Sequence, residues 1–207
     1  MSREKTDADG RDRILAVALR SFAERGYEGT TTAGVAREAE VTQPLVHHHF
    51  GSKEGLWRAA MDQLFSEVRL FTRLDPALPP TEALLDVVER FVRLSAQRPE
   101  LSRILAREGA QPGPRLTYLI DRHLGAQLRE IVGVLQSEQR AGIIDPGLRP
   151  ELLFFLVTGA AAHLFDVAAL ARQALGVDTS SADTQEAFVA TVRSVLERGV
   201  RGEGEKR

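Results

Sequence analysis

The chain has 207 residues, carries 27 Lys and Arg against 29 Asp and Glu, and contains no cysteine. This length allows one large domain or two small ones with cores of their own. The missing cysteines exclude disulfides, thiolate metal sites and cysteine nucleophiles, and the formal net charge of −2 is unlike that of a strongly basic nucleic-acid-binding domain.

Two segments bear on location in the cell. Residues 1–13 are charged and polar, without the apolar run of a signal peptide. The most apolar segment, 152–171, is interrupted by Thr158, His163 and Asp166, whereas a membrane-spanning helix needs about 20 nearly uncharged residues. We therefore expect a soluble, cytoplasmic protein with no membrane partner.

Apolar residues recur at helical spacing from the start of the chain, and the alternation typical of strands is rare. The first predicted helix ends at Gly26, and its apolar face comprises Ile14, Leu15, Ala18, Leu19 and Phe22. Thr31 is the expected N-cap of a short second helix, and Thr42 that of a third, with Pro44 in its first turn. Ser52 is expected to cap a longer fourth helix that ends before the proline-rich segment 75–80.

Five further helices are predicted after this linker. We expect one capped by Thr81, a short one opened by Pro99, and longer ones over 114–140, 150–174 and 182–199, with a frayed tail at 202–207. The apolar seam of the 114–140 helix is Leu116, Ile120, Leu124, Leu128, Ile131 and Leu135. The pattern predicts an all-α protein of about nine helices, with an N-terminal three-helix helix-turn-helix head and a C-terminal helical bundle.

The first part of the chain carries the motif that points to function. Two short helices joined by a tight turn and followed by a longer helix form a helix-turn-helix unit, whose second helix enters the major groove of DNA. In Thr31-Thr32, Val35–Ala39, Val41–Phe50 and Ser52–Leu56, and in the preceding Phe22–Thr30, the chain resembles the TetR family of transcriptional regulators. The resemblance implies a DNA-binding domain over 10–70, with the motif at about 31–50, and an effector-binding and dimerisation domain over 80–200.

Three positions depart from the usual residues of that family. Glu40 stands where the family usually has Gly, at a turn position that favours positive φ, and a Glu there either costs on the order of 1 kcal/mol of strain or forces another turn geometry. Gly34 replaces a carboxylate of the first turn, which loosens the second helix. His47 replaces a tyrosine that touches the DNA backbone.

The residues and the resemblance together assign DNA contacts to polar side chains of the head. Thr31 and Thr42, at helix N-termini, can position phosphates, and Lys53 supplies a cation to the same backbone. Gln43 can bind an adenine in bidentate fashion, and Pro44 can touch a thymine methyl group. Weaker candidates for base or phosphate contact are Thr32, His48 and His49, and His47 is a candidate for the DNA-backbone contact of the tyrosine that it replaces. Leu45, Val46 and Phe50 are assigned to packing. The alternative for each polar residue is capping or solvation.

The three consecutive histidines, His47, His48 and His49, do not predict a metal site. Neighbours on a helix are rotated by about 100°, whereas chelation from one face uses i, i+4 spacing. Histidine changes charge between about pH 5 and 8, so we hypothesise that protonation near pH 6 strengthens phosphate contact. We expect no metal and no cofactor.

The resemblance further implies a homodimer, joined by a four-helix bundle from the last two helices of each subunit. The candidate interface residues are Gly159, Ala160, Ala162, Phe188, Val192, Val195 and Leu196; the alternative is that they form the core of their own subunit. It also implies an effector pocket among the middle helices, for which the candidates are Phe91, Tyr118, His123, His163 and Asp166. The alternative for each of these is packing within a helix bundle.

We predict a ligand-responsive transcriptional regulator, a repressor that binds a palindromic operator in double-stranded DNA as a dimer and is released by a small-molecule effector. An enzyme is not expected, because no hydrolytic triad, metal-ligand spacing or phosphate loop is present. The alternative is a helical small-molecule-binding or interaction module with a weakened head. Over residues 1–60, nine Lys and Arg balance nine Asp and Glu, so we expect a log K against log[salt] slope shallower than about −10.

Overall fold

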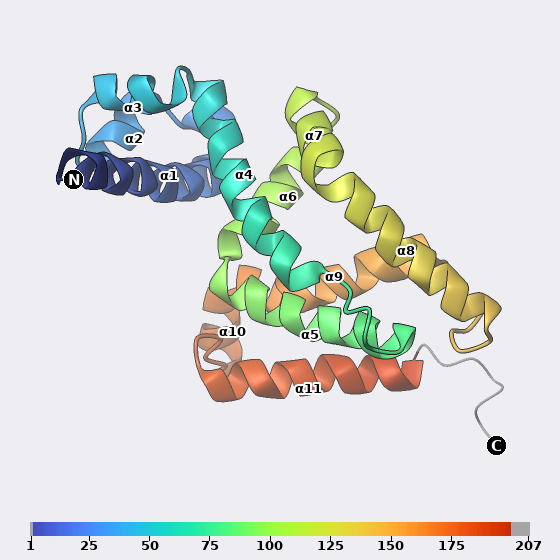
Figure 1. Cartoon of the computed structure of the whole chain (residues 1–207). Helices are drawn as coiled ribbons and strands as arrows, with labels where there is room; N and C mark the ends of the chain where they lie inside the picture. Colours follow the sequence, from blue (N-terminus) through green and yellow to red (C-terminus); the bar gives the residue numbers. More distant parts are fainter. Residues whose placement is uncertain (1, 200–207) are drawn as a thin grey trace. The chain divides into compact units, whose positions relative to one another are not determined.

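The computed structural model describes residues 2–199; the tail at 202–207, for which fraying was expected, lies outside them. The described chain is a succession of α-helices joined by turns (Figure 1), which confirms the all-α prediction. It divides into two compact units. The first comprises the chain up to Glu67 together with Glu100–Leu119, and the second comprises Val68–Pro99 and the chain from Ile120 onward. Residues 100–119, which the sequence placed in the second domain, thus cluster with the head.

The first unit contains the predicted head. Its helices are α1 (Ser2–Gly29), α2 (Thr32–Glu38), α3 (Gln43–Phe50), most of α4 (Lys53–Thr72), α6 (Pro99–Gly109) and α7 (Pro114–Leu119). α1 breaks at Gly26, which has a φ of 72°. Arg107 of α6 lies against this break: it donates to the Glu24 carbonyl at 3.3 Å, and a Cβ on Gly26 would stand 2.2 Å from its Nη1. The backbone conformation therefore requires glycine at this position, whereas the flexible Arg107 side chain can move aside for a Cβ.

Two of the four predicted helix caps are confirmed. The hydroxyl oxygen of Thr31 accepts from the Gly34 amide at 3.0 Å, and that of Ser52 accepts from the Gly55 amide at 3.0 Å. Thr42 is the N-cap residue of α3, but its side chain makes no cap hydrogen bond to a described residue. The Thr81 cap is wrong, because α5 begins one residue earlier and Thr81 donates its hydroxyl to Glu138 instead.

The second unit is a bundle around α5 (Pro80–Gln97). Its other helices are the π-helical turn η1 (Ile120–Leu124), α8 (Gly125–Arg140), α9 (Pro150–Asp166), α10 (Ala168–Leu175) and α11 (Ala182–Gly199). α5 packs against α8, α9 and α11. The buried side chains form two clusters, one of Val92, Ala161, Phe165 and Val189 and the other of Ile131, Leu135, Ile144 and Leu153.

The two longest predicted helices are interrupted. In the 114–140 segment, η1 separates α7 from α8, and Leu119 is buried while Ile120 of the predicted seam is 41% exposed. The 150–174 segment bends by 67° at Val167, between α9 and α10. Within residues 2–199, no single helix has the length and apolar composition to cross a membrane; only the bent pair α9 and α10, counted together, meets those two criteria.

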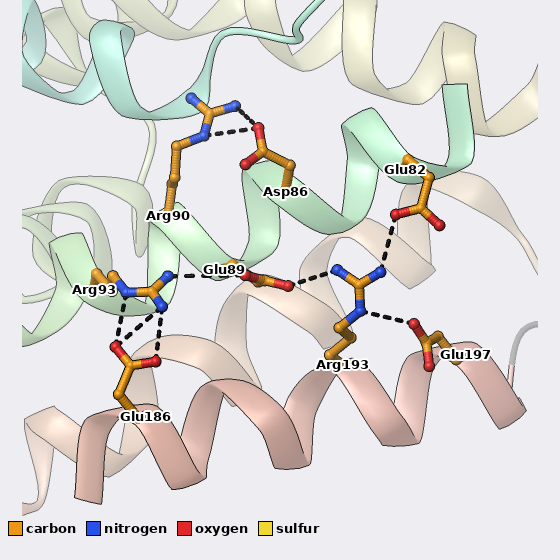
Figure 2. Close-up of polar contacts among 8 residues, drawn as sticks. All are labelled: Glu82, Asp86, Glu89, Arg90, Arg93, Glu186, Arg193 and Glu197. Carbon is orange, nitrogen blue, oxygen red and sulfur yellow. Dashed lines mark hydrogen bonds and ion pairs between the residues drawn. The ribbon is translucent and has the colours of Figure 1, made fainter. Parts of the chain in front are cut away.

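Ion pairs join α5 to α11 (Figure 2). Arg193 of α11 donates to Glu89 at 2.7 Å and to Glu82 at 2.9 Å, both on α5, and to Glu197 of its own helix at 2.7 Å. Hydrogen bonds from Arg193 to these three carboxylates, with Glu89 the strongest, raise the pKa of its guanidinium above its ordinary value. Together these contacts fix the long axis of α11 along α5.

Two further arginines, both on α5, contact neighbouring elements. Arg93 pairs with Glu186 of α11 at 2.9 Å, which adds a second ionic contact between these helices (Figure 2). Arg90 donates to the carbonyl oxygens of Phe71 and Arg73, each at 2.8 Å. A guanidinium at the C-terminus of a helix donates to carbonyl oxygens that have no partner within the helix, and its charge complements the helix dipole. Arg90 therefore stabilises the end of α4.

Candidate DNA-binding interface

α3 presents one face to solvent and buries the other. Val46 is 1% exposed and anchors the helix, while Leu45 and Phe50 are half-buried, in agreement with their predicted packing role. The exposed residues are Gln43, Pro44, His47 and His48, together with the N-cap residue Thr42. α2 contacts α3, and both contact α1. The head therefore has the helix-turn-helix arrangement in which the polar face of α3 is open.

The turn between α2 and α3 contains Glu40 in the left-handed conformation. Its φ is 55°, and it is the only non-glycine residue with positive φ within residues 2–199. The Glu40 amide donates to the Arg37 carbonyl at 3.2 Å, and the Val41 amide donates to the Ala36 carbonyl at 2.9 Å. The sequence-based expectation for this turn is confirmed: the tight reversal is kept, and Glu40 carries its strain.

The N-terminus of α2 carries the two threonines predicted to contact DNA. Thr31 is exposed and Thr32 half-buried. Because the Thr31 oxygen accepts from the Gly34 amide, its own O–H remains a donor for an anion. A Cβ on Gly34 would stand 3.0 Å from that oxygen, so a larger residue there would press on the cap. This end of α2 combines a hydroxyl donor with the amides of a helix N-terminus, which together suit a phosphate.

The three histidines occupy different surroundings. His47 is exposed, and its Nδ1 lies 3.1 Å from the Gly51 carbonyl oxygen. A carbonyl only accepts, so Nδ1 carries the proton in this contact. His48 is exposed, whereas His49 is half-buried with its ring 5.4 Å from that of His48 and 5.8 Å from that of Phe50. Among the side chains of residues 2–199, no three His, Asp or Glu gather closely enough to hold a metal ion.

Cations of the head are partly engaged within the protein. Arg25 donates to both carboxylate oxygens of Glu38, at 2.8 and 2.9 Å. Lys53, at the start of α4, is half-buried and holds its Nζ 4.4 Å from the centre of the Tyr27 ring. Because contacts within the protein engage some of these cations, fewer are available to bind phosphate than the number of Lys and Arg residues in the head.

The five predicted effector-binding residues are distributed between the two units and between core and surface. Tyr118 belongs to the first unit, where its hydroxyl donates to Asp62 at 2.7 Å. Phe91 packs against the Val92 cluster, and His123 is half-buried in η1. The other two, His163 and Asp166, are exposed on α9.

An apolar stripe that the sequence analysis missed lies on α9. Leu152, Phe155 and Leu156 are 57%, 67% and 69% exposed, and the predicted Gly159 and Ala160 continue the same face. Their spacing of i, i+3, i+4, i+7 and i+8 is the signal that could have found them. On α11, the predicted Val195 is 64% exposed.

The remaining predicted dimer residues lie deeper in their own subunit. Ala162 is 8% exposed, and Phe188 and Val192 pack against the Val92 cluster. The rings of Phe165 and Phe188 meet edge to face, with centroids 5.9 Å apart. Leu196 is half-buried. Ala162, Phe188 and Val192 thus pack between helices of their own chain, and their place in a dimer interface stays a prediction.

Comparison with known proteins agrees with this architecture. Residues 14–60 match the family described as "Bacterial regulatory proteins, tetR family", and residues 60–203 match "YcdC-like protein, C-terminal region". The HTH-type transcriptional repressor SCO4008 of Streptomyces coelicolor is 27% identical over 149 residues, which cover 72% of this chain and 74% of that protein.

Solved structures show the same fold. The transcriptional regulator SCO4942 of Streptomyces coelicolor superposes with a TM-score of 0.66 at 26% identity, over 89% of this chain and 97% of that one. AibR, solved in complex with isovaleryl coenzyme A and operator DNA, gives a TM-score of 0.68 at 20% identity, over 90% and 97%. With family matches over both segments of the sequence, the chain belongs to the TetR family of transcriptional regulators.

Proposed function

We propose that this protein is a transcriptional repressor that binds a palindromic operator as a homodimer and leaves it when a small-molecule effector binds. The observation that carries the proposal is the open polar face of α3 in a helix-turn-helix that keeps its tight turn at Glu40. The intact turn also speaks against the alternative of a weakened head. SCO4008 is named a repressor, and AibR was solved with both a coenzyme A ester and operator DNA. This function is regulatory, with no catalytic step and no cofactor, and belongs in the cytoplasm.

Sequence is read by the first turn of α3. In helix-turn-helix proteins, the N-terminal residues of the second helix contact base edges, and here Gln43 and Pro44 hold those positions, both exposed. The amide of Gln43 matches the donor and acceptor pair of adenine. Thr31, Thr42 and Lys53 contact phosphates on either side, with Thr32 and the three histidines as further candidates, and these contacts set the register of the helix on the duplex.

Dimerisation uses the apolar stripe of α9 with the exposed part of α11. Leu152, Phe155 and Leu156 expose large side chains beside Gly159 and Ala160, whose small size lets a second helix approach. On α11, Val195 is 64% exposed and Leu196 is half-buried, and both are candidates for the same interface. A second copy of the chain covers the stripe. The dimer then carries two heads, one for each half-site of the operator.

Effector binding belongs to the helical domain. Phe91, His123, His163 and Asp166 remain the candidates there, and Tyr118 is a candidate at the junction of α7 with η1. A ligand that releases DNA must bind the DNA-free state more tightly than the bound state, since affinity alone shifts no equilibrium.

The DNA-binding proposal is tested by selecting duplexes from random-sequence DNA with the full chain. We expect an enriched sequence with two half-sites related by two-fold symmetry, bound with a salt slope shallower than about −10. Gln43→Ala should weaken binding to the enriched duplex by about 10- to 100-fold. The matched control is Gln63→Ala, on the exposed side of α4. No enrichment, or equal losses in both variants, would contradict the proposal.

The homodimer is tested separately by sedimentation at micromolar concentration. The double variant Phe155→Asp, Leu156→Asp places two charges in the stripe and should sediment as a monomer, while the wild type sediments as a dimer. Leu70→Asp is the control, because Leu70 is 76% exposed but belongs to α4 and not to the stripe. A monomeric wild type would refute the assignment.

A further inference from the structure

Tyr27 is contacted by two cations from different helices. It follows the break of α1 at Gly26, is half-buried, and stacks on Phe22 with ring centres 6.1 Å apart and planes 11° from parallel. The Nζ of Lys53 lies 4.4 Å from the ring centre, and the Cζ of Arg115 lies 4.3 Å from it. Both distances are within the range in which the face of an aromatic ring attracts a cation.

The first of these cations is the predicted phosphate ligand. Lys53 begins α4, and besides the ring its ammonium makes a long contact of 3.5 Å to the Glu28 carbonyl oxygen. An ammonium has three N–H donors, so these two contacts leave at least one for a phosphate. A free lysine side chain has many rotamers to lose on binding, and a lysine already held in place loses fewer.

The second cation comes from α7. Arg115 donates through Nε to Glu108 at 2.9 Å, and the Glu108 side chain is only 9% exposed. This buried carboxylate fixes the guanidinium and offsets its charge, while the guanidinium packs on Tyr27. Since both cations lie within 4.4 Å of one ring centre, they are at most about 9 Å apart, and salt at a Debye length of about 8 Å partly screens their repulsion.

We propose that Tyr27 is a positioning residue for DNA binding, which holds Lys53 in place for a phosphate. Arg115, by packing on the same ring, makes this placement depend on α7. The inference rests on the proposed function, in which Lys53 contacts the DNA backbone. The new element is that α7, which continues through η1 into α8, affects operator affinity, because its Arg115 packs on the ring of Tyr27.

The experiment is a double-mutant cycle with the full chain and the duplex enriched by the wild type, read by fluorescence anisotropy over a range of salt concentrations. Lys53→Gln should lower affinity and reduce the salt slope by about 0.9, the share of one phosphate contact. Tyr27→Leu should lower affinity by about two- to fivefold, the worth of one exposed cation–π contact. Tyr27→Phe keeps the ring face and should bind like the wild type. In the Lys53→Gln background, Tyr27→Leu should have no further effect.

Arg115→Gln gives a second, milder cycle that does not alter the aromatic core. Its loss should be smaller than that of Tyr27→Leu, and it should disappear in the Lys53→Gln background. Arg115→Lys should show a similar loss, because it keeps the charge but not the planar guanidinium that packs on the ring. If Tyr27→Leu fails to fold, as judged by circular dichroism, the Arg115 and Lys53 pair alone decides the question.

Two outcomes overturn the inference and leave the proposed function standing. One is a loss from Tyr27→Leu or Arg115→Gln that is equal in both backgrounds, which would mean that these residues only support the fold. The other is a wild-type salt slope in Lys53→Gln, which would mean that Lys53 contacts no phosphate. Failure of the wild type to enrich any duplex would instead refute the proposed function, and this inference with it.

Discussion

Replacing Glu40 with glycine should stabilise the head. The residue adopts a φ of 55° at the end of α2, and the left-handed conformation costs an L-residue about 1–2 kcal/mol. Glycine removes that strain but adds about 0.4–1 kcal/mol of backbone entropy to the unfolded chain. Because the Glu40 side chain is exposed, little packing is lost. We expect Glu40→Gly to raise the free energy of unfolding by about 0.5–1 kcal/mol.

The matched control reverses the change at another residue of positive φ in the same unit. Gly51 has a φ of 71° at the end of α3, and a Cβ there meets no described atom within 4 Å. Gly51→Ala therefore introduces strain without a clash and should cost about 1 kcal/mol. Trp57 is the only tryptophan of the chain and is 1% exposed within the first unit, so its fluorescence during urea unfolding reports on the head. A Glu40→Gly variant less stable than the wild type, or a neutral Gly51→Ala, would refute the argument.

Two further predictions concern charge. Arg193→Met removes three part-exposed ion pairs and should lower the free energy of unfolding of the helical domain by about 1–2 kcal/mol. The loss should be smaller in 1 M NaCl, because salt screens the ion pairs. Circular dichroism during urea unfolding measures this loss, and an equal loss in Arg198→Met would contradict the prediction. The pKa of Asp178 is lowered to about 2 by hydrogen bonds from Ser180 and Arg172, so its stabilising contribution is complete above about pH 4 and lost as the pH falls through 2; an NMR titration midpoint near 4 would rule this out.

Local signals in the sequence predict most of the head. Thr31 and Ser52 cap their helices as expected, because a hydroxyl next to a free amide needs no distant partner. Thr81 shows the limit of that reasoning. Its hydroxyl bonds to Glu138, which lies 57 residues further along the chain, and no local pattern contains that contact. The assignment of α3 as the DNA-reading helix rests on the family motif, and its individual base contacts stay predictions.

The π-helical turn η1 was missed although the sequence contains a trace of it. Leu116, Ile120, Leu124 and Leu128 are spaced by four, and on a regular helix each such step overshoots the turn by about 40°. A wider turn absorbs the accumulated drift. Gly125 directly follows η1, and a Cβ there would stand 2.9 Å from the Ile120 carbonyl oxygen. The bend at Val167 has no comparable signal, since neither Gly nor Pro marks it.

The apolar stripe of α9 also affects how operator occupancy depends on the concentration of this protein. A stripe of large exposed apolar side chains such as Phe155 and Leu156 favours association with a second copy that removes it from water. Under the proposed pairing, the free energy of unfolding rises with subunit concentration by mass action. Operator occupancy then grows with the square of that concentration while most subunits are single. A modest fall in synthesis would empty the operator steeply, even in the absence of an effector.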